Sequence, residues 1–574
     1  MPAAISGGAV ISRALSRYGI RTVFAVAGAS HSWLLDALAK SGFEIISSRH
    51  ESGCVSAADG YARVTGRLGV ALIIADQGMP NAINGIAAAF HACSAVLVLV
   101  ARLPDSWTES EAESDNLQHR LIGSITKWAR TVPSETRLVE YVDAAAKRAL
   151  SGRRGPVVLQ IPQEFLQARC DSIDLPPPPV SLVRGPVPDP IAIETAARAL
   201  VTAQRPLLIV GAGACYGDAG DALRALVAEH EIPVAGNGLG RGLVPEDGQR
   251  SFSWPYMQIA ACEADVVCVI GARLKQRLGF GLAPRFASDA IFIQVDVIAE
   301  ELSRNRPIDI PIVADAGAAS RALLEAMRAA DTRPAAGRGY WLHDRLQARR
   351  DYLSSLESAT SEVSPVHPLA LGNTLARHVT SDTIVVGDGA DIQNWMYASL
   401  PVRQSPGFLD HYPLGAMGVG TPLAIGAAAA AKEMAKASGV TRRKVVLVTG
   451  DGSFGFYPAE WHAAARADLD ITCFIGNDGA WGTEWHGQQQ ALGVTVNTEL
   501  GRLPYELVAQ GFGCRGLRID NATELEATVR TALNHTGPCV VNVMIDRDSG
   551  HALKTVKLAR MILFDDLTAG KVRA

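Results

Sequence analysis

Short runs of apolar, β-branched residues alternate with alanine-rich stretches of helical period along the whole chain. The first part carries such runs at residues 23–26, 44–47, 70–75, 95–101 and 156–161. Runs that are apolar throughout, without alternating polar positions, are typical of strands buried on both faces of a parallel sheet. Because these runs alternate with helical stretches, the pattern predicts an α/β fold.

Two further blocks of the same kind follow. The second contains runs at 207–211, 233–235, 265–270 and 291–295, and the third at 383–386, 444–449, 471–475 and 540–545. A proline run at 176–179 ends the first block, because no helix or central strand continues through it. A polar stretch at 330–339 and a solvated helix at 340–356 lead into the third. We therefore expect three doubly wound parallel-sheet domains, at residues 1–175, 186–330 and 363–574, the last ending in a C-terminal tail.

Composition and charge narrow the function. The 574 residues are 48% hydrophobic and 20% charged, as in a globular protein, and the formal net charge of −4 gives no reason to expect a nucleic-acid partner. The scattered cysteines form no C-x-x-C pair, so neither a disulfide framework nor a zinc site is predicted. No apolar run approaches the ~20 residues of a membrane helix. Arg13 and Arg17 interrupt what would be a signal peptide, so we expect a cytoplasmic location.

The most informative motifs follow two strands of the third block. Gly-Asp-Gly-Ser at 450–453 ends one strand, and Asn-Asp-Gly at 477–479 ends the next. Carboxyl ends of neighbouring strands form the ligand crevice of a doubly wound sheet, so Asp451 and Asp478 are expected to converge on one hard cation. Gly452 lets the backbone approach phosphate oxygens, and Ser453 can bind them.

This pair of motifs resembles the signature of the thiamine diphosphate enzymes, Gly-Asp-Gly followed about two dozen residues later by Asn-Asn. Here 24 residues separate Gly452 from Asn477. The resemblance implies thiamine diphosphate as cofactor and a metal bound by Asp451, Asp478 and the carbonyl of Ala480, and oxygen ligands favour Mg²⁺. Asp478 stands where the family has its second Asn. That change adds a negative charge beside a diphosphate and leaves Asn477 as a rival ligand.

The resemblance covers essentially the whole chain, in the order pyrimidine-binding, central and diphosphate-binding domain. It implies that Glu51 is the catalytic group that hydrogen-bonds N1′ of the aminopyrimidine and relays a proton. Gly415 and Met417, in the glycine-rich segment 414–420, match the segment that bends the cofactor, with Met417 between its two rings. The other cofactor contacts implied by matching segments are Asn81, Gly389, Ala390, Asp391, Gly452 and Ser453.

The central segment 271–296 is similar to that of 2-hydroxyacyl-CoA lyases and oxalyl-CoA decarboxylases, whose central domain holds the ADP part of coenzyme A. The resemblance implies a nucleotide site with Gly213 and Ala214 in its loop. Arg273 would meet a phosphate and Asp296 the ribose. Other basic residues able to meet phosphates are Lys275, Arg277 and Arg285. Acetolactate synthases place FAD here and benzaldehyde lyase has a comparable segment without CoA, so CoA, FAD and neither remain alternatives.

Four residues are candidates for contact with the substrate. Glu484, in the helix after the metal motif, is a candidate acid or base, and a solvated helix-start Glu is the alternative. Gln118 resembles the Leu-Gln of benzaldehyde lyase, while Asp115 falls in the register of the Gln-Glu pair of other members. His31 is a further candidate, although a lone His is usually structural.

The sequence thus predicts a thiamine diphosphate- and Mg²⁺-dependent carbon–carbon lyase or carboligase acting on a 2-hydroxyacyl-CoA, with a carbonyl compound and formyl-CoA as the other reactants. The alternatives are an acetolactate synthase-like or benzaldehyde lyase-like enzyme that acts without CoA, and a regulatory subunit without cofactor. Since Glu51 and Asp451 lie on domains that meet across a dimer interface in this family, a homodimer or homotetramer is expected.

Overall fold

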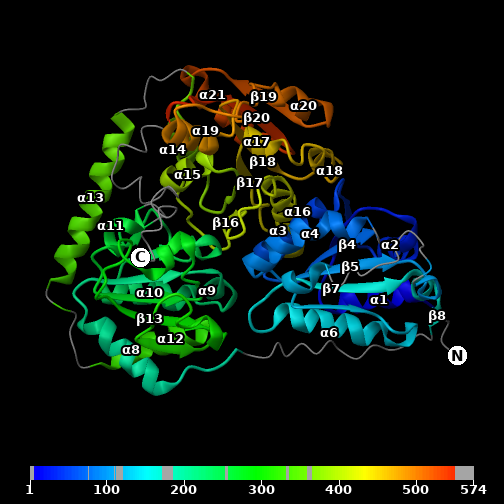
Figure 1. The fold of residues 1–574 in the computed structure, drawn as a ribbon, viewed down its shortest axis with the longest axis horizontal. Helices are drawn as coiled ribbons and strands as arrows, with labels where there is room; N and C mark the ends of the chain where they lie inside the picture. Colours follow the sequence, from blue (N-terminus) through cyan, green and yellow to red (C-terminus); the bar gives the residue numbers. More distant parts are fainter. Residues whose placement is uncertain are drawn as a thin grey trace.

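The computed structural model describes residues 5–549 except 75–76, 109, 111–120, 171–184, 253–255, 331–334, 336 and 359–364. Three lobes follow one another along the chain and surround a common centre, coloured blue to cyan, green, and yellow to red in Figure 1. Each lobe contains one parallel sheet of six strands with helices on both faces. The α/β fold expected from the sequence is confirmed.

The N-terminal sheet has the strand order β3-β2-β4-β5-β7-β6. Its strands are β2 (Thr22–Ala25), β3 (Glu44–Ser47), β4 (Gly69–Ile74), β5 (Val96–Arg102), β6 (Trp128–Thr131) and β7 (Val157–Pro162). The helices are α1 (Gly7–Arg17), α2 (Ser32–Lys40), α3 (Glu51–Thr65), α4 (Gly78–Ala92), α6 (Leu138–Leu150) and α7 (Gln163–Gln167). The short strands β1 (Ile5–Ser6) and β8 (Arg169–Cys170) pair antiparallel beside it.

The central sheet has the order β11-β10-β9-β12-β13-β14. Its strands are β9 (Pro206–Val210), β10 (Val234–Gly236), β11 (Ser251–Phe252), β12 (Val266–Ile270), β13 (Ile291–Asp296) and β14 (Ile310–Val313). The helices are α8 (Pro190–Thr202), α9 (Ala212–Tyr216), α10 (Gly220–His230), α11 (Met257–Ala261) and α12 (Ala316–Ala329). The helix expected at 340–356 is α13 (Arg338–Ser358), which links this lobe to the third.

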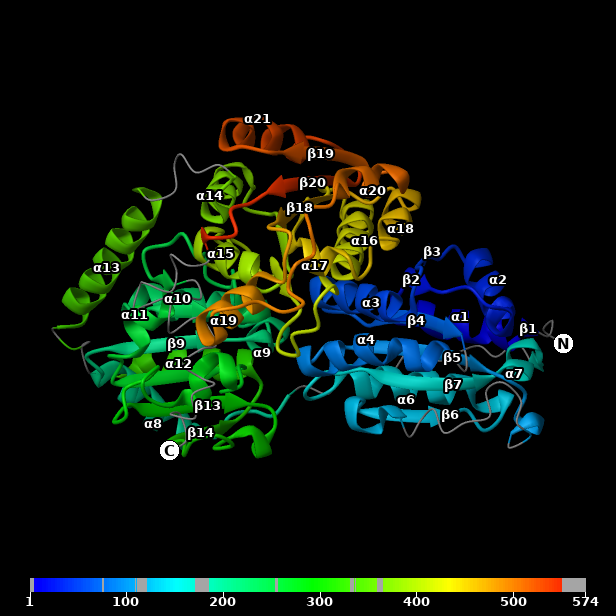
Figure 2. The ribbon, with the colours of Figure 1, turned by 45° about the horizontal axis from the view of Figure 1, so that its top comes forward.

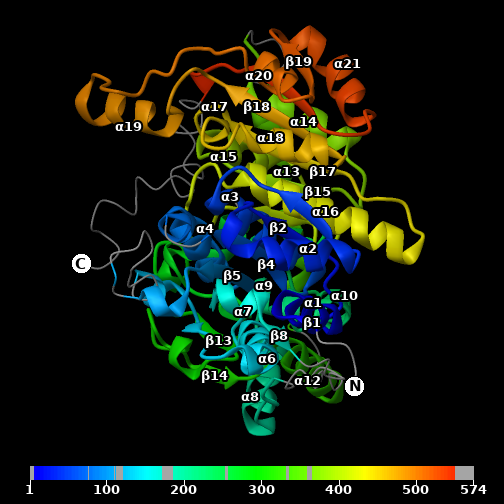
Figure 3. The same cartoon turned by 90° about the vertical axis from the view of Figure 1, so that its right-hand side faces the viewer.

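The C-terminal sheet has the order β16-β15-β17-β18-β20-β19. Its strands are β15 (Ile384–Gly387), β16 (Phe408–Asp410), β17 (Val445–Gly450), β18 (Ile471–Asn477), β19 (Arg515–Ile519) and β20 (Cys539–Met544). The helices are α14 (Pro368–His378), α15 (Asp391–Ser399), α16 (Gly420–Ser438), α17 (Asp451–Phe454), α18 (Glu460–Arg466), α19 (Gly482–Leu492), α20 (Tyr505–Gly511) and α21 (Ala522–Leu533). Figures 2 and 3 show α19 projecting away from its sheet.

Helices α3 and α16 join the N-terminal lobe to the C-terminal one (Figure 2). Every residue of α3 except Thr65 is buried, which explains its composition of Ala, Gly, Ser and Cys. A side chain at Gly60 or Gly426 would not fit, because its Cβ would lie 2.2 Å from the Leu423 carbonyl oxygen or 1.9 Å from that of Ala57. This close packing fixes the start of α3, where Glu51 lies, relative to the C-terminal sheet.

Candidate active site

The carboxyl ends of β15, β17 and β18 meet at a small cavity of about 60 Å³. Because neighbouring parallel strands end at one edge of the sheet, the two motifs that are far apart in the sequence come together here. The predicted site residues that line the cavity are Gly389, Ala390, Asp391, Met417, Asp451, Gly452, Ser453, Asp478, Ala480 and Glu484.

Two buried carboxylates lie at this cavity. The Asp451 carboxylate accepts a hydrogen bond from the Gly479 amide at 3.0 Å, and that of Asp478 accepts one from the Ala480 amide at 3.0 Å. Burial raises the pKa of both carboxyl groups. For Asp451, burial and the neighbouring Asp478 charge together raise the pKa to about 8. Two close carboxylates with little solvent are stabilised by a bound cation, so the pair fits a divalent metal.

Asn477, the rival metal ligand, uses its side-chain nitrogen in contacts outside the cavity, while its side-chain oxygen is buried and accepts no hydrogen bond from the described residues. Its side-chain amide donates to the Asn542 side-chain oxygen at 3.0 Å and to the Leu503 carbonyl at 3.1 Å. Asn477 does not line the cavity, whereas Asp478 and Ala480 do. The geometry therefore favours Asp478 over Asn477 as the residue that faces a ligand.

The cavity walls also fit a phosphate group. The hydroxyl of Ser453 is buried and makes no hydrogen bond to any residue that the structure describes. The glycines allow close approach, because a Cβ at Gly482 would lie 2.5 Å from an Asp478 carboxylate oxygen and one at Gly452 would lie 2.4 Å from the Trp481 ring. A free buried hydroxyl beside the two carboxylates is able to donate a hydrogen bond to a diphosphate oxygen.

Asp388 holds the segment that carries Met417. Its carboxylate accepts hydrogen bonds from the amides of Gly418 at 3.2 Å and Gly420 at 3.0 Å, and it contacts His411 Nδ1 at 3.0 Å. These contacts tie the glycine-rich segment 414–420 to the end of β15. Gly415 adopts a φ of +81° and does not line the small cavity.

Glu51 is buried at the first position of α3, with 5% of its surface exposed. Asn81 in α4 donates its side-chain amide to a Glu51 carboxylate oxygen at 3.0 Å, so the structure brings these two predicted residues together. Neither lines the small cavity. Glu484 is exposed at the start of α19 and does line it, while Gln118 and Asp115 lie outside the described residues.

His31 lies after β2, close to the edge that carries Glu51, and is 1% exposed. Burial lowers its pKa to about 4, more than the neighbouring Val26 backbone raises it. The unfolded chain, with an ordinary His pKa, binds a proton first as the pH falls, so His31 should destabilise the fold between about pH 6.5 and 4. We expect the Tm to fall less in His31→Gln than in wild type over this range, by calorimetry. His343→Gln, at an exposed histidine, is the control and should lose Tm as wild type does. An equal loss of Tm in His31→Gln and wild type would contradict the prediction.

A second, larger cavity of about 620 Å³ lies between the N-terminal and central lobes. It is lined by the predicted residues Gly213, Arg273 and Asp296, whereas Ala214 and Arg285 are buried and do not line it. The cationic residues along its wall are Arg63, Arg153, Arg154, Arg273, Lys275, Arg277 and Arg321. Burial and the nearby Arg273 charge lower the pKa of Lys275 to about 8. Such crowding of cations fits an anionic ligand with several phosphates.

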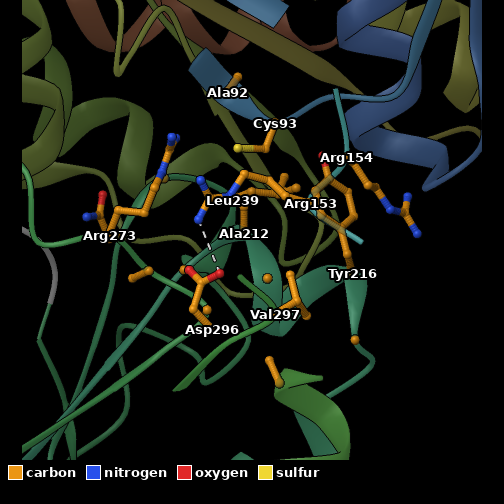
Figure 4. Close-up of a pocket in the computed structure, with 18 of the residues that line it drawn as sticks. Ala92, Cys93, Arg153, Arg154, Ala212, Tyr216, Leu239, Arg273, Asp296 and Val297 are labelled. Carbon is orange, nitrogen blue, oxygen red and sulfur yellow. Dashed lines mark hydrogen bonds and ion pairs between the residues drawn. The ribbon is translucent and has the colours of Figure 1, made fainter. Parts of the chain in front are cut away.

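Arg153 and Arg154, in the loop before β7, were not identified from the sequence. Figure 4 shows Arg153 pointing across the cavity to Asp296, with a nitrogen–oxygen distance of 3.2 Å. The Arg154 guanidinium lies over the Tyr216 ring, 4.2 Å from its centroid. In the sequence they are two adjacent arginines shortly before a strand. Only the packing of the central lobe against this loop shows that they line a cavity.

The wall of the large cavity leads toward the glycine-rich segment 414–420. Residues 408–410, 412 and 413 line the cavity, and Gly415 follows two residues later. Arg277 packs over the Tyr412 ring at 3.3 Å from its centroid and donates to the Tyr397 hydroxyl at 2.9 Å. A ligand held in the large cavity therefore lies beside the chain segment that leads to Met417.

Comparison with known protein families shows three matches along the chain. Residues 5–121 match the N-terminal TPP binding domain of thiamine pyrophosphate enzymes, residues 193–323 the central domain, and residues 388–543 the C-terminal TPP binding domain. The matches follow the order of the three lobes.

Curated relatives are similar over nearly their whole length. A probable acetolactate synthase of Mycobacterium bovis is 31% identical, covering 94% of this chain and 95% of the relative. The 2-hydroxyacyl-CoA lyase 1 of Mus musculus is 30% identical, covering 95% of each chain. The human 2-hydroxyacyl-CoA lyase 1 is 28% identical, covering 94% of this chain and 95% of the relative.

In the part of the chain that the structure describes, none of the helices combines the length and the apolar character of a membrane span.

Proposed function

Because this chain belongs to the thiamine pyrophosphate enzymes, we propose that it makes or breaks the C1–C2 bond of a 2-hydroxyacyl-CoA, with a carbonyl compound and formyl-CoA as the other reactants. One observation carries the choice of substrate. A cavity of about 620 Å³, whose wall carries seven Arg and Lys side chains and four Asp side chains among the described residues, lies beside the segment that leads to Met417. A thioester of coenzyme A needs such a place for its phosphates near the reacting carbon.

The small cavity would hold the diphosphate end of the cofactor and Mg²⁺. Asp451, Asp478 and the carbonyl of Ala480 supply oxygen ligands for the metal, and the Ser453 hydroxyl donates to a phosphate oxygen. Gly389, Ala390, Asp391 and Gly452 complete the wall on the phosphate side. When bound, thiamine diphosphate supplies a nucleophilic carbon that adds to carbonyl groups and stabilises the charge left when a carbon–carbon bond breaks.

The protein's own residues orient the reactants and move protons. Glu51 exchanges a proton with the ring nitrogen of the pyrimidine, and Asn81 holds its carboxylate in place. Gly415 and Met417 support the pyrimidine side of the cofactor. Glu484 and Gln118 are the proposed contacts to the substrate oxygen.

Arg273 should matter for acyl-CoA and not for a small free aldehyde. It lines the large cavity, and losing one charge-assisted phosphate contact costs about 1.5 to 3 kcal/mol. We expect Arg273→Ala to raise the KM for a 2-hydroxyacyl-CoA about tenfold to a hundredfold with little change in kcat. Steady-state kinetics with acyl-CoA and with free aldehydes measure the difference.

Arg328→Ala provides the matched control, because Arg328 lies on α12 in the same lobe and pairs with Glu229 at the surface. It should leave both reactions unchanged. Equal loss of both reactions in Arg273→Ala would argue against a CoA site in this cavity.

The second candidate is an acetolactate synthase-like carboligase that acts on 2-oxo acids without CoA. It is favoured by the 31% identity to the Mycobacterium bovis acetolactate synthase. A thermal-shift panel of CoA, ADP, FAD and pyruvate with the holoenzyme separates the two, since a ligand that binds only the native state raises the Tm. Stabilisation by CoA and ADP supports the lyase, and stabilisation by FAD with turnover of pyruvate supports the synthase.

A further inference from the structure

Glu460 of the C-terminal lobe reaches into the loop that carries Glu51. It is the first residue of α18 and is 2% exposed. One of its carboxylate oxygens accepts hydrogen bonds from the amides of Arg49 at 2.9 Å and His50 at 3.1 Å. These are the two residues directly before Glu51, between β3 and α3.

Two neighbours of Glu460 also contact the residues around Glu51. The Tyr457 hydroxyl donates to the Ser52 hydroxyl oxygen at 3.0 Å, and the Arg49 guanidinium contacts His462 Nδ1 at 2.8 Å. Tyr457, Glu460 and His462, which we call the α3 clamp, therefore hold both sides of Glu51. Tyr457 follows Ser453 of the phosphate-binding motif by only four residues.

Burying the Glu460 carboxylate costs free energy, which suggests that this contact has a role beyond domain packing. Burial raises the pKa of Glu460 to about 7, although the two amide hydrogen bonds and the Arg49 charge act in the opposite direction. Gly53 leaves the space that the carboxylate fills, since a Cβ there would lie 2.5 Å from the Glu460 oxygen. A buried carboxylate is expensive to keep, and an apolar contact would join the lobes at less cost.

We propose that Glu460 is a positioning residue for Glu51: it fixes the start of α3 so that the Glu51 carboxylate stands at the distance needed to exchange a proton with the cofactor ring nitrogen. The proposal rests on the proposed function in one respect, the proton-relay role of Glu51, and does not depend on the identity of the substrate. A proton relay is sensitive to placement, and a displacement of about 1 Å can cost about a hundredfold in rate.

The experiment measures the rate of hydrogen–deuterium exchange at the thiazolium C2 of thiamine diphosphate bound to the holoenzyme, by rapid quench and NMR, with no substrate present. We expect Glu460→Ala to slow this exchange about tenfold to a hundredfold. Glu460→Gln keeps an oxygen acceptor for both amides, so it should stay within about threefold of wild type. Arg466→Ala, at an exposed position in the last turn of α18 and outside the clamp, is the matched control and should exchange at the wild-type rate.

A second variant keeps the test decisive if Glu460→Ala fails to fold. Gly53→Ala should push the carboxylate away from the loop and slow C2 exchange in the wild-type background. In the Glu460→Ala background, the space next to Gly53 is no longer filled by the carboxylate. Gly53→Ala should then slow C2 exchange little further, because the two changes act on one contact. Amide hydrogen exchange of residues 49–54 in the cofactor-free protein, followed by mass spectrometry, should rise in Glu460→Ala and not in Glu460→Gln.

The outcomes separate the two proposals. Wild-type C2 exchange in folded Glu460→Ala, or in Gly53→Ala, overturns the role of Glu460. Equal slowing by Glu460→Gln and Glu460→Ala also overturns it, since the acceptor would then be irrelevant. If Glu51→Gln itself exchanges at the wild-type rate, it is the proposed role of Glu51 that fails.

Discussion

Glu51→Gln is expected to lower turnover by about a thousandfold while changing the affinity for thiamine diphosphate only by about threefold or less. The amide has nearly the shape of the carboxylate, so the buried start of α3 should be preserved. Glu51 accepts the Asn81 amide at 3.0 Å, and a glutamine oxygen can accept it equally well. What the variant lacks is a group that takes up and returns a proton near neutral pH.

Two measurements check this expectation. Calorimetric titration of the cofactor with Mg²⁺ gives the affinity, and steady-state or single-turnover kinetics gives the rate. Glu44→Gln is the matched control, since Glu44 lies in the same lobe and pairs with Lys432 away from the cavities. Near-wild-type turnover in Glu51→Gln would remove the basis for a proton relay at this position.

The strands that the sequence failed to predict are edge strands. β6, β11, β14, β16 and β19 each lie at the edge of a six-stranded sheet and were missed, while the central strands were found within one or two residues at their ends. A central strand is buried on both faces and is apolar throughout. The edge strands β6, β14 and β19 are partly exposed, whereas β16 is buried but covers only three residues. β11 covers only Ser251–Phe252, a length that leaves no periodic pattern to detect.

The two aspartates proposed to bind the metal could be placed together from the sequence because they lie at the ends of neighbouring strands. β17 and β18 are adjacent and parallel, so Asp451 and Asp478 come together from pattern alone. Arg153 could not be found in this way. It meets Asp296 across two lobes, and no local periodicity encodes how separate domains pack. Glu460 could not be identified from the sequence for the same reason: it contacts another lobe, and its amide partners precede it by more than four hundred residues.

Mixing Glu51→Gln chains with Asp451→Ala chains is expected to restore activity that neither variant has alone. Within one chain, Glu51 does not line the small cavity that contains Asp451, so we expect the two groups to meet at one cofactor only across a pair of chains. A hybrid dimer then has one site with both defects and one site with none. Random exchange makes half of the dimers hybrid, so recovery should reach at most about a quarter of wild-type activity.

The hybrids can be isolated for the assay if the two variants carry different tags. The chains are unfolded or exchanged together, and dimers that carry both tags are then purified. A mixture of Glu51→Gln with itself should stay inactive, and purified hybrids without activity would mean that each chain builds its own site.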